Sequence, residues 1–187
     1  MKKVDIRTKF TKKAFKDSLL ELMKTSPIRD IPIKAICAGA GVSRSTFYTY
    51  YNNPFDLLYE IQNETLANFE AKFGKVTHKF DLQETRNFYE ETLRYIAENN
   101  DSIRVLLSEN GDPEFVKKII ERSIANTQKV IKLSLEGSSD EKMERVYSVF
   151  FVHGSIALLQ DWIKRDMDIP ISKMAKVYIK FINNIMH

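Results

Sequence analysis

Apolar residues recur every three or four positions along most of the chain, and no long stretch alternates apolar with polar residues. This spacing places side chains on one face of an α-helix, whereas a half-buried strand would require alternation. The pattern therefore predicts an all-α protein of about nine helices. We expect one helix from about residue 5 to 25, short helices after Pro32 and Ser43, a fourth from Pro54 to about Gly74, and further helices at roughly 82–99, 101–108, 113–135, 138–167 and after Pro170.

Two of these helices can be predicted in more detail. Ser138 and Glu141 are three residues apart at the start of the helix at 138–167, which is the spacing of a capping box, so we expect Ser138 to cap it. The inward face of the first helix should consist of its apolar stripe, which is Phe10, Ala14, Phe15, Leu19, Leu22 and Met23.

Residues 31–51 predict two short helices that are joined by a tight glycine turn. Gly41 has no Cβ and can adopt a positive φ at the turn. Ser43 is a favourable N-cap for the second helix, which leaves Arg44 and Ser45 on its exposed first turn. In a DNA-binding helix-turn-helix, this first turn reaches base edges in the major groove, where an arginine can bind guanine through two hydrogen bonds. The same pattern also fits an αα-corner that contacts no DNA.

The distribution of charge favours the DNA-binding interpretation. Residues 1–60 contain 11 Lys and Arg against 6 Asp and Glu, whereas residues 61–187 contain 18 against 19. Lys9 and Lys12, with Lys13 and Lys16, lie on the first helix and are placed to meet phosphates. A basic, solvated helix face or a membrane-surface segment within residues 1–16 would show the same asymmetry.

Residues 40–51, Ala-Gly-Val-Ser-Arg-Ser-Thr-Phe-Tyr-Thr-Tyr-Tyr, followed by Asp56-Leu57-Leu58, resemble the TetR family of bacterial transcriptional regulators, and the resemblance extends over residues 5–60. It implies a helix-turn-helix DNA-binding domain at 1–53 and an effector-binding and dimerisation domain at 54–187. It further implies a repressor that binds a pseudo-palindromic operator as a homodimer and is released by a small-molecule effector. By position, the base contacts would be Lys34, Arg44, Ser45 and Tyr48, and the phosphate contacts Ser43, Thr46, Thr49 and Tyr50.

The start of the fourth helix departs from the family pattern. Pro54 stands where many members have a phosphate-binding lysine, and Asn52 and Asn53 replace positions that are often basic. This departure leaves a second function open, in which a helical regulator with weakened DNA binding acts mainly through a protein partner, in the manner of a coactivator.

The C-terminal helices predict a dimer interface. The helix at 138–167 is apolar nearly all round between Val149 and Leu159, so it must be covered on more than one side. Together with the last helix it suits a four-helix interface between two copies; burial inside a monomer is the alternative. The expected interface residues are Val149, Ala157, Val177, Phe181 and Ile185.

Aromatic residues of the C-terminal helices are candidates for lining an effector pocket, although rings at helical spacing more often belong to the core. These candidates are Phe88, Tyr95, Phe115, Tyr147, Phe150, Phe151 and Trp162.

Other classes of function find little support in the sequence. The three histidines and one cysteine show no metal-ligand spacing, and no nucleotide-binding or nucleophile motif occurs, so we expect no enzyme, metal or cofactor. The longest apolar stretch, Val146–Leu159, is shorter than the roughly 20 residues that cross a bilayer. Without a signal peptide or an internal disulfide, a cytoplasmic protein with no membrane partner is expected.

Overall fold

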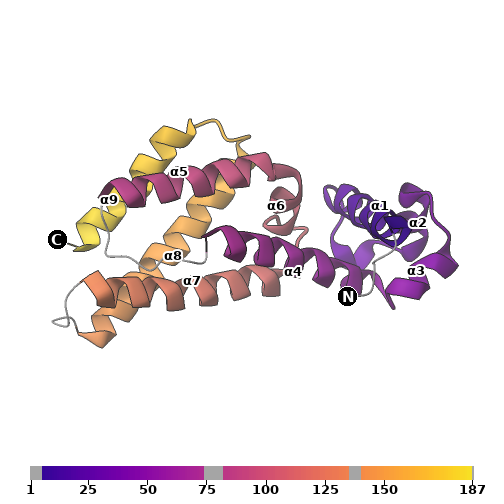
Figure 1. Cartoon of the computed structure of the whole chain (residues 1–187), viewed down its shortest axis with the longest axis horizontal. Coiled ribbons are helices and arrows are strands. Elements are labelled where there is room, and N and C mark those ends of the chain that lie inside the picture. Colours follow the sequence, from indigo (N-terminus) through magenta and orange to yellow (C-terminus); the bar gives the residue numbers. More distant parts are fainter. Residues whose placement is uncertain (1–5, 74–81, 135–139, 187) are drawn as a thin grey trace. The chain divides into compact units, whose positions relative to one another are not determined.

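The computed structural model describes residues 6–73, 82–134 and 140–186, apart from the side chains of 82, 130–134 and 183–186. Over these residues the chain forms nine α-helices, one short 3-10 helix and no strand, which confirms the predicted all-α fold (Figure 1). The elements are α1 (Ile6–Met23), η1 (Ile28–Asp30), α2 (Ile33–Ala40), α3 (Arg44–Tyr50), α4 (Pro54–Phe73), α5 (Leu82–Glu98), α6 (Asn100–Leu106), α7 (Pro113–Ser134), α8 (Glu141–Lys164) and α9 (Ile171–Met186).

The chain divides into two compact units. The first consists of Met1–Glu70 and Val105–Pro113, and the second of Ala71–Arg104 and Glu114–His187. The first unit thus includes most of α4 together with α1, α2 and α3. The segment at 105–113 belongs to the same unit, where the amide of Gln62 donates to Asp112 at 3.1 Å.

A small aromatic and aliphatic core holds the first unit together. Phe15 of α1 and Phe47 of α3 are fully buried and meet edge to face, with ring centroids 5.3 Å apart. α1 and α2 approach closely because the hydroxyl of Ser18 donates to the carbonyl of Ile36 at 2.9 Å. A Cβ at Gly39 would lie 2.4 Å from that hydroxyl, so a side chain there would displace the hydrogen bond.

Phe10 does not belong to this core, contrary to the prediction for the first helix. It is 69% exposed, and Ile6 one turn earlier is also exposed, whereas Phe15 is fully buried. The buried stripe of α1 begins at Phe15 because the first two turns of the helix extend beyond the side chains that cover the rest.

The N-terminus of α4 is closed by reciprocal hydrogen bonds between side chains and backbone. The backbone N–H of Asp56 donates to the amide oxygen of Asn53 at 3.0 Å, and the carboxylate of Asp56 accepts from the N–H of Asn52 at 3.0 Å. This arrangement is a capping box, with Pro54 at the first helical position, where no N–H is needed. The hydrogen bonds from Asn52, with a further one from Asn53, lower the pKa of Asp56.

In the second unit, α5 lies along α9 (Figure 1). The rings of Tyr89 and Tyr178 stack almost in parallel with centroids 5.2 Å apart, and the hydroxyl of Tyr178 donates to the carbonyl of Ser155 in α8 at 3.0 Å. These contacts tie three helices together. Burial raises the pKa of Tyr178 to about 12, so its hydroxyl stays protonated as the donor.

The connection from α8 to α9 is unusual in its backbone. Asp166 and Met167 have positive φ values of 53° and 57°, which non-glycine residues seldom adopt. The N–H of Met167 donates to the carbonyl of Trp162 at 2.8 Å, and Arg104 of α6 binds the carboxylate of Asp166 at 2.6 Å. The indole of the buried Trp162 donates to Ile169 at 2.8 Å. These bonds hold the two residues in their strained conformation.

Two expectations about α8 need correction. The helix begins at Glu141, and its N-cap is Asp140, whose carboxylate accepts from the N–H of Lys142 at 2.9 Å. Glu141 is thus the first helical residue, and Ser138 lies outside the described residues. By length and composition alone, α8 is also long and apolar enough to cross a membrane, with a mean hydropathy of 1.2, the one such helix in the described ranges. The apolar stretch Val146–Leu159, which by itself is too short to cross a bilayer, is only the middle part of this helix.

Candidate nucleic-acid interface

A tight corner joins α2 to α3, as the sequence predicts. Gly41 ends α2 in the left-handed region with a φ of 65°, and its N–H donates to the carbonyls of Ala38 and Cys37. Ser43 caps α3, because its hydroxyl accepts from the N–H of Thr46 at 3.2 Å. Both the glycine turn and the serine cap are therefore confirmed. Together they fix where the first turn of α3 starts.

α3 has one buried and one exposed face. Phe47 is fully buried, and Tyr51 after the helix is also buried, in ring contact with Phe47 at 5.5 Å. The solvent-exposed residues of α3 are Arg44, Ser45, Tyr48 and Thr49, with Tyr48 at 52%. Tyr50, next to Tyr51, is half-exposed. The aromatic core thus presents a short polar surface to the solvent.

Hydroxyl groups gather at the N-terminal end of this surface. The hydroxyl of Ser43 lies 2.8 Å from that of Ser45 and 2.9 Å from that of Thr46. One turn later, the hydroxyl of Thr49 donates to the carbonyl of Ser45 at 3.1 Å. Hydroxyls can donate to phosphate oxygens or exchange hydrogen bonds with base edges, so this cluster has the chemistry that a nucleic-acid surface requires.

Three cations of the first unit are available to an anionic partner. Lys34 of α2, Arg44 of α3 and Lys9 of α1 are exposed, and within the described part of the chain none of them pairs with a carboxylate. Lys13, by contrast, pairs with Asp17 at 2.5 Å. The basic patch of the sequence is therefore partly neutralised in the fold.

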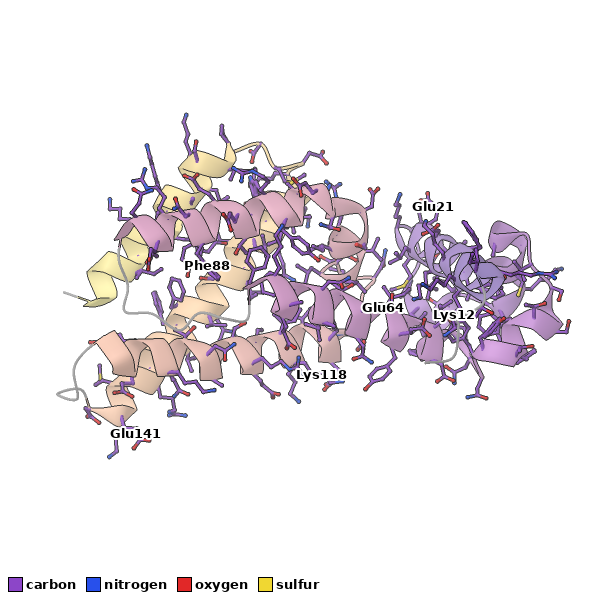
Figure 2. All side chains as sticks on the ribbon, in the orientation of Figure 1. Lys12, Glu21, Glu64, Phe88, Lys118 and Glu141 are labelled. Atoms are coloured by element: carbon purple, nitrogen blue, oxygen red, sulfur yellow. The ribbon has the colours of Figure 1, made fainter. Side chains whose placement is uncertain are left out.

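Lys12, expected to contact a phosphate, lies in a different environment. Figure 2 labels its side chain. Its ammonium is 2.8 Å from the carboxylate of Glu60 in α4, and it lies over the rings of Tyr50 and Tyr51 at 5.8 Å and 5.4 Å from their centroids. Lys16 binds the other oxygen of Glu60 at 2.7 Å. Lys12 is thus engaged within the protein.

Lys12, Lys16, Glu60 and Glu64 form a charged cluster, which shifts the pKa values of Glu60 and Lys16. Burial acts to raise the pKa of Glu60, but the hydrogen bonds and charges of Lys12 and Lys16 outweigh it and lower that pKa. Burial also acts to lower the pKa of Lys16, and the two glutamates reverse the effect and raise it. Glu60 and Lys16 therefore both remain charged at neutral pH.

The sequence contained a signal for this cluster that the sequence analysis did not use. Lys12 and Lys16 are four residues apart on one helix, and Glu60 and Glu64 are four residues apart on another. Two helices that pack side by side bring such pairs into register. The capping role of Asn52 and Asn53 was likewise missed, although Asp56 three residues after Asn53 carries the capping-box spacing.

The aromatic residues expected in an effector pocket divide into three groups. Phe88 and Tyr95 of α5 both contact the ring of Phe73 in α4, at 5.9 Å and 5.6 Å between centroids (Figure 2). Phe115 and Trp162 are buried, and Tyr147 and Phe151 are half-buried. Phe150 stands apart from the other rings, because it is 69% exposed on the outer face of α8.

The residues expected at a dimer interface lie on the exposed faces of α8 and α9. Val149 and Ala157 of α8 and Val177 and Phe181 of α9 are all exposed. Ile185 lies in α9, but its side chain is outside the described part of the structure. An exposed apolar face of this kind, extended by Val146 and Phe150, is typical of a surface that another protein covers.

Groups suited to catalysis are sparse in the described residues. No cluster of three His, Cys, Asp or Glu in the ranges 6–73, 82–134 and 140–186 is placed to hold a metal ion. Burial raises the pKa of the Cys37 thiol, an effect that Arg44 reduces, so the thiol stays protonated. His153 is exposed on α8.

Comparisons with known proteins agree with this architecture. Residues 83–184, more than half of the chain, match a TetR-type family model described as a transcriptional regulator C-terminal region. A Bacillus subtilis (strain 168) protein named uncharacterized HTH-type transcriptional regulator YxbF is 25% identical over 112 residues, which are 58% of this chain and 30% of that protein. The match therefore spans less than a third of that relative's length.

Three solved structures share the fold. A TetR-like transcriptional regulator from Rhodococcus sp. RHA1 is 19% identical, with 91% of this chain and 92% of that chain covered and a TM-score of 0.69. A TetR transcriptional regulator from Streptococcus agalactiae 2603V is 20% identical, with 95% and 96% covered and a TM-score of 0.69. The fatty acid degradation regulator FadR from Bacillus halodurans is 13% identical, with 94% of each chain covered and a TM-score of 0.72.

Proposed function

This chain belongs to the TetR family of transcriptional regulators, a non-enzymatic family, and we propose that it is a repressor that binds a pseudo-palindromic DNA operator as a homodimer and is released by a small-molecule effector. The observation that carries the proposal is the exposed first turn of α3, where Arg44 has no carboxylate partner among the described residues and stands beside the hydroxyl cluster of Ser43, Ser45 and Thr46.

In this proposal α3 is the recognition helix. Arg44 binds a guanine through two hydrogen bonds, a contact that discriminates against other bases by about 1–3 kcal/mol. The other base contacts are Lys34 of α2 and Ser45 and Tyr48 of α3, each of which is exposed. The phosphate contacts are Ser43, Thr46, Thr49 and Tyr50, with Lys9 from α1.

The homodimer is proposed to form through the exposed apolar faces of α8 and α9. Two copies would then present two recognition helices to successive major grooves, whose centres are about 34–36 Å apart. An interface explains the apolar length of α8 better than a membrane span, because the family match at 83–184 includes the whole helix. The protein would act in the cytoplasm, where its operator lies.

The effector is proposed to bind in the second unit, among the aromatic residues of α5, α7 and α8. It would release DNA only if it favours a conformation that binds the operator less well, since a ligand shifts an equilibrium by its differential affinity for the two states. The candidates are the rings at 88, 95, 115, 147, 151 and 162, while Phe150 fits the dimer face better.

Selection of bound sequences from fragments of the source genome, followed by mobility-shift titration of the selected site, tests the DNA-binding proposal. We expect a pseudo-palindromic site whose affinity falls at least tenfold in Arg44→Ala, in line with the loss of a bidentate base contact. Arg29→Ala is the matched control, because Arg29 is an exposed arginine of η1 in the same unit. Failure to select any specific site would reject the proposal.

A second candidate function rests on the start of α4. Asn52 and Asn53 form hydrogen bonds with Asp56, and Pro54 has no N–H to donate to a phosphate. The start of α4 therefore offers few of the phosphate contacts that would strengthen DNA binding. A regulator of this kind would control transcription mainly through a protein partner. It predicts that transcription of the neighbouring genes changes when the protein is deleted, even though no specific site is selected.

A further inference from the structure

Lys12 lies where α1, the end of α3 and α4 meet. Its side chain is 32% exposed, its ammonium donates to Glu60 at 2.8 Å, and it lies over the rings of Tyr50 and Tyr51. We infer that Lys12 and Glu60 are positioning residues that set the C-terminal end of the recognition helix, and that Lys12 does not bind a phosphate. The inference rests on the proposed function, in which α3 contacts DNA.

The first step concerns charge. Lys12 and Lys16 bind the two oxygens of Glu60 at 2.8 Å and 2.7 Å, and Lys16 also binds Glu64 at 2.5 Å. Two ammonium groups thus face two carboxylates, and the cluster has no net positive charge with which to attract a phosphate. Lys9 lies on the same helix and is exposed. Among the described residues no carboxylate pairs with it, so its charge is open to a phosphate.

The second step concerns the contacts that Lys12 would lose by turning to DNA. A cation over an aromatic face is attracted by the negative face of the ring, and here one ammonium lies within 6 Å of two rings. Reaching a phosphate would break both contacts and the hydrogen bond to the part-buried Glu60. Glu60 would keep Lys16 but lose the donor at its other oxygen, and losing a hydrogen bond to a part-buried charged group is costly, so the position of Lys12 inside the protein is favoured.

The third step connects Lys12 to the DNA-facing surface. Tyr51 is buried against Phe15 and Phe47, with centroids 6.3 Å and 5.5 Å away, so its ring is fixed by the core. Tyr50, whose ring is 6.3 Å from that of Tyr51, is half-exposed and is a proposed phosphate contact. Lys12 contacts both rings and thereby links Glu60 of α4 to the last turn of the recognition helix.

Binding to the selected operator and to an unrelated duplex of equal length, each measured over a series of salt concentrations, tests this inference. A lysine that binds a phosphate contributes about 0.9 to the slope of log K against log salt and acts on all sequences alike. Lys9→Gln is the matched control. Because the proposed homodimer carries two copies of Lys9, it should reduce the magnitude of that slope by about 1.8 and weaken both duplexes equally. Lys12→Gln should leave the slope and the unrelated duplex unchanged but weaken the operator about tenfold.

Two further variants test the parts of the mechanism. Lys12→Arg keeps the charge, the pair with Glu60 and the ring contacts, so it should bind the operator within about threefold of the original chain. Glu60→Gln should weaken the operator as Lys12→Gln does, although it adds net positive charge. Circular dichroism shows whether each variant is folded. A stoichiometric titration with operator gives the fraction of each variant that can bind DNA, which should equal that of the original chain.

The outcomes separate this inference from the function on which it rests. If the original chain selects no operator, the proposed function fails and the inference fails with it. If the operator is bound but Lys12→Gln behaves like Lys9→Gln, or like the unchanged chain, Lys12 is not a positioning residue. If Lys12→Gln behaves as expected and Glu60→Gln leaves operator affinity unchanged, the part assigned to Glu60 is wrong.

Discussion

Single residues decide how α3, the proposed recognition helix, is presented. Gly41 turns the backbone through the left-handed region, Ser43 caps the helix that follows, and Phe47 fixes it to the core. Each of these residues acts through its own neighbours in the sequence or through burial of one side chain. The presentation of Arg44 therefore depends on local backbone geometry as much as on the arginine itself.

Gly41→Ala isolates the contribution of the backbone. A Cβ at Gly41 would have no heavy atom within 4 Å, so the substitution causes no clash, but a φ of 65° is unfavourable for alanine. We expect a loss of about 1 kcal/mol in the free energy of unfolding, measured by urea denaturation. Gly41→Asn is the control and should lose less, because asparagine tolerates this region. Equal losses in the two variants would show that backbone strain is not the cause.

Local chemistry was predictable from the sequence at this scale, and long-range pairing was not. The glycine turn and the serine cap depend on residues within three positions of each other, so the sequence pattern contains them. Lys12 and Glu60 are 48 positions apart, and their pairing depends on how α1 packs on α4. Phe10 shows the same limit, because its periodicity fits the buried stripe but it is 69% exposed among the residues that the structure describes.

At the scale of helices, charged pairs and tight packing hold the first unit together. α1 meets α2 through Ser18 and the small residue at Gly39, and it meets α4 through the cluster around Glu60. Helix positions were largely predictable, since proline, glycine and periodicity mark most ends. The start of α8 was not, because Ser138, Ser139 and Asp140 are all good caps and spacing alone does not choose among them.

The pH dependence of stability reports on the α1–α4 pairing. The pKa of Glu60 is lower in the folded chain than its ordinary value of about 4.3, so the folded state binds this proton less tightly than the unfolded state. Its contribution to stability is complete above that ordinary value and is lost as the pH falls through the folded pKa. Acid therefore weakens the pairing, and alkaline conditions up to the lysine range leave it intact.

Glu60→Gln tests this dependence. We expect the variant to be about 1.5 kcal/mol less stable at neutral pH, the scale of a hydrogen bond to a charged group, with the difference shrinking below about pH 4. Urea denaturation over a pH series measures it. Glu21→Gln, at an exposed position of α1, is the control and should differ little from the original chain. A difference that stays constant into acid would show that the charge of Glu60 is not the stabilising feature.

For the whole molecule, the exposed apolar face of α8 and α9 is the feature that one chain leaves unexplained. Its exposed apolar residues are Val146, Val149 and Phe150 of α8 and Val177 and Phe181 of α9. Burying any of these side chains away from water would lower the free energy of the protein. The sequence predicted the apolar character of these helices, but not which of their residues the chain itself would bury. A second copy would cover the face and bring a second recognition helix to the DNA.

Phe150→Glu tests this arrangement, because a carboxylate at the centre of a dimer interface would be buried without a partner. We expect sedimentation velocity to show a monomer with unchanged helical content for Phe150→Glu and a dimer for the original chain. Phe10→Glu is the matched control, because both phenylalanines are 69% exposed and only Phe150 lies on the proposed interface, so this variant should remain dimeric.

Operator binding should follow the oligomeric state. A dimer holds its second recognition helix near the second half-site, and this effective concentration raises affinity by about 100-fold or more over one half-site. Phe150→Glu should therefore bind the whole operator about 100-fold more weakly, but bind an isolated half-site as the original chain does. If Phe150→Glu remains dimeric, the face lies outside the interface. If it is monomeric and keeps full operator affinity, dimerisation does not serve DNA recognition.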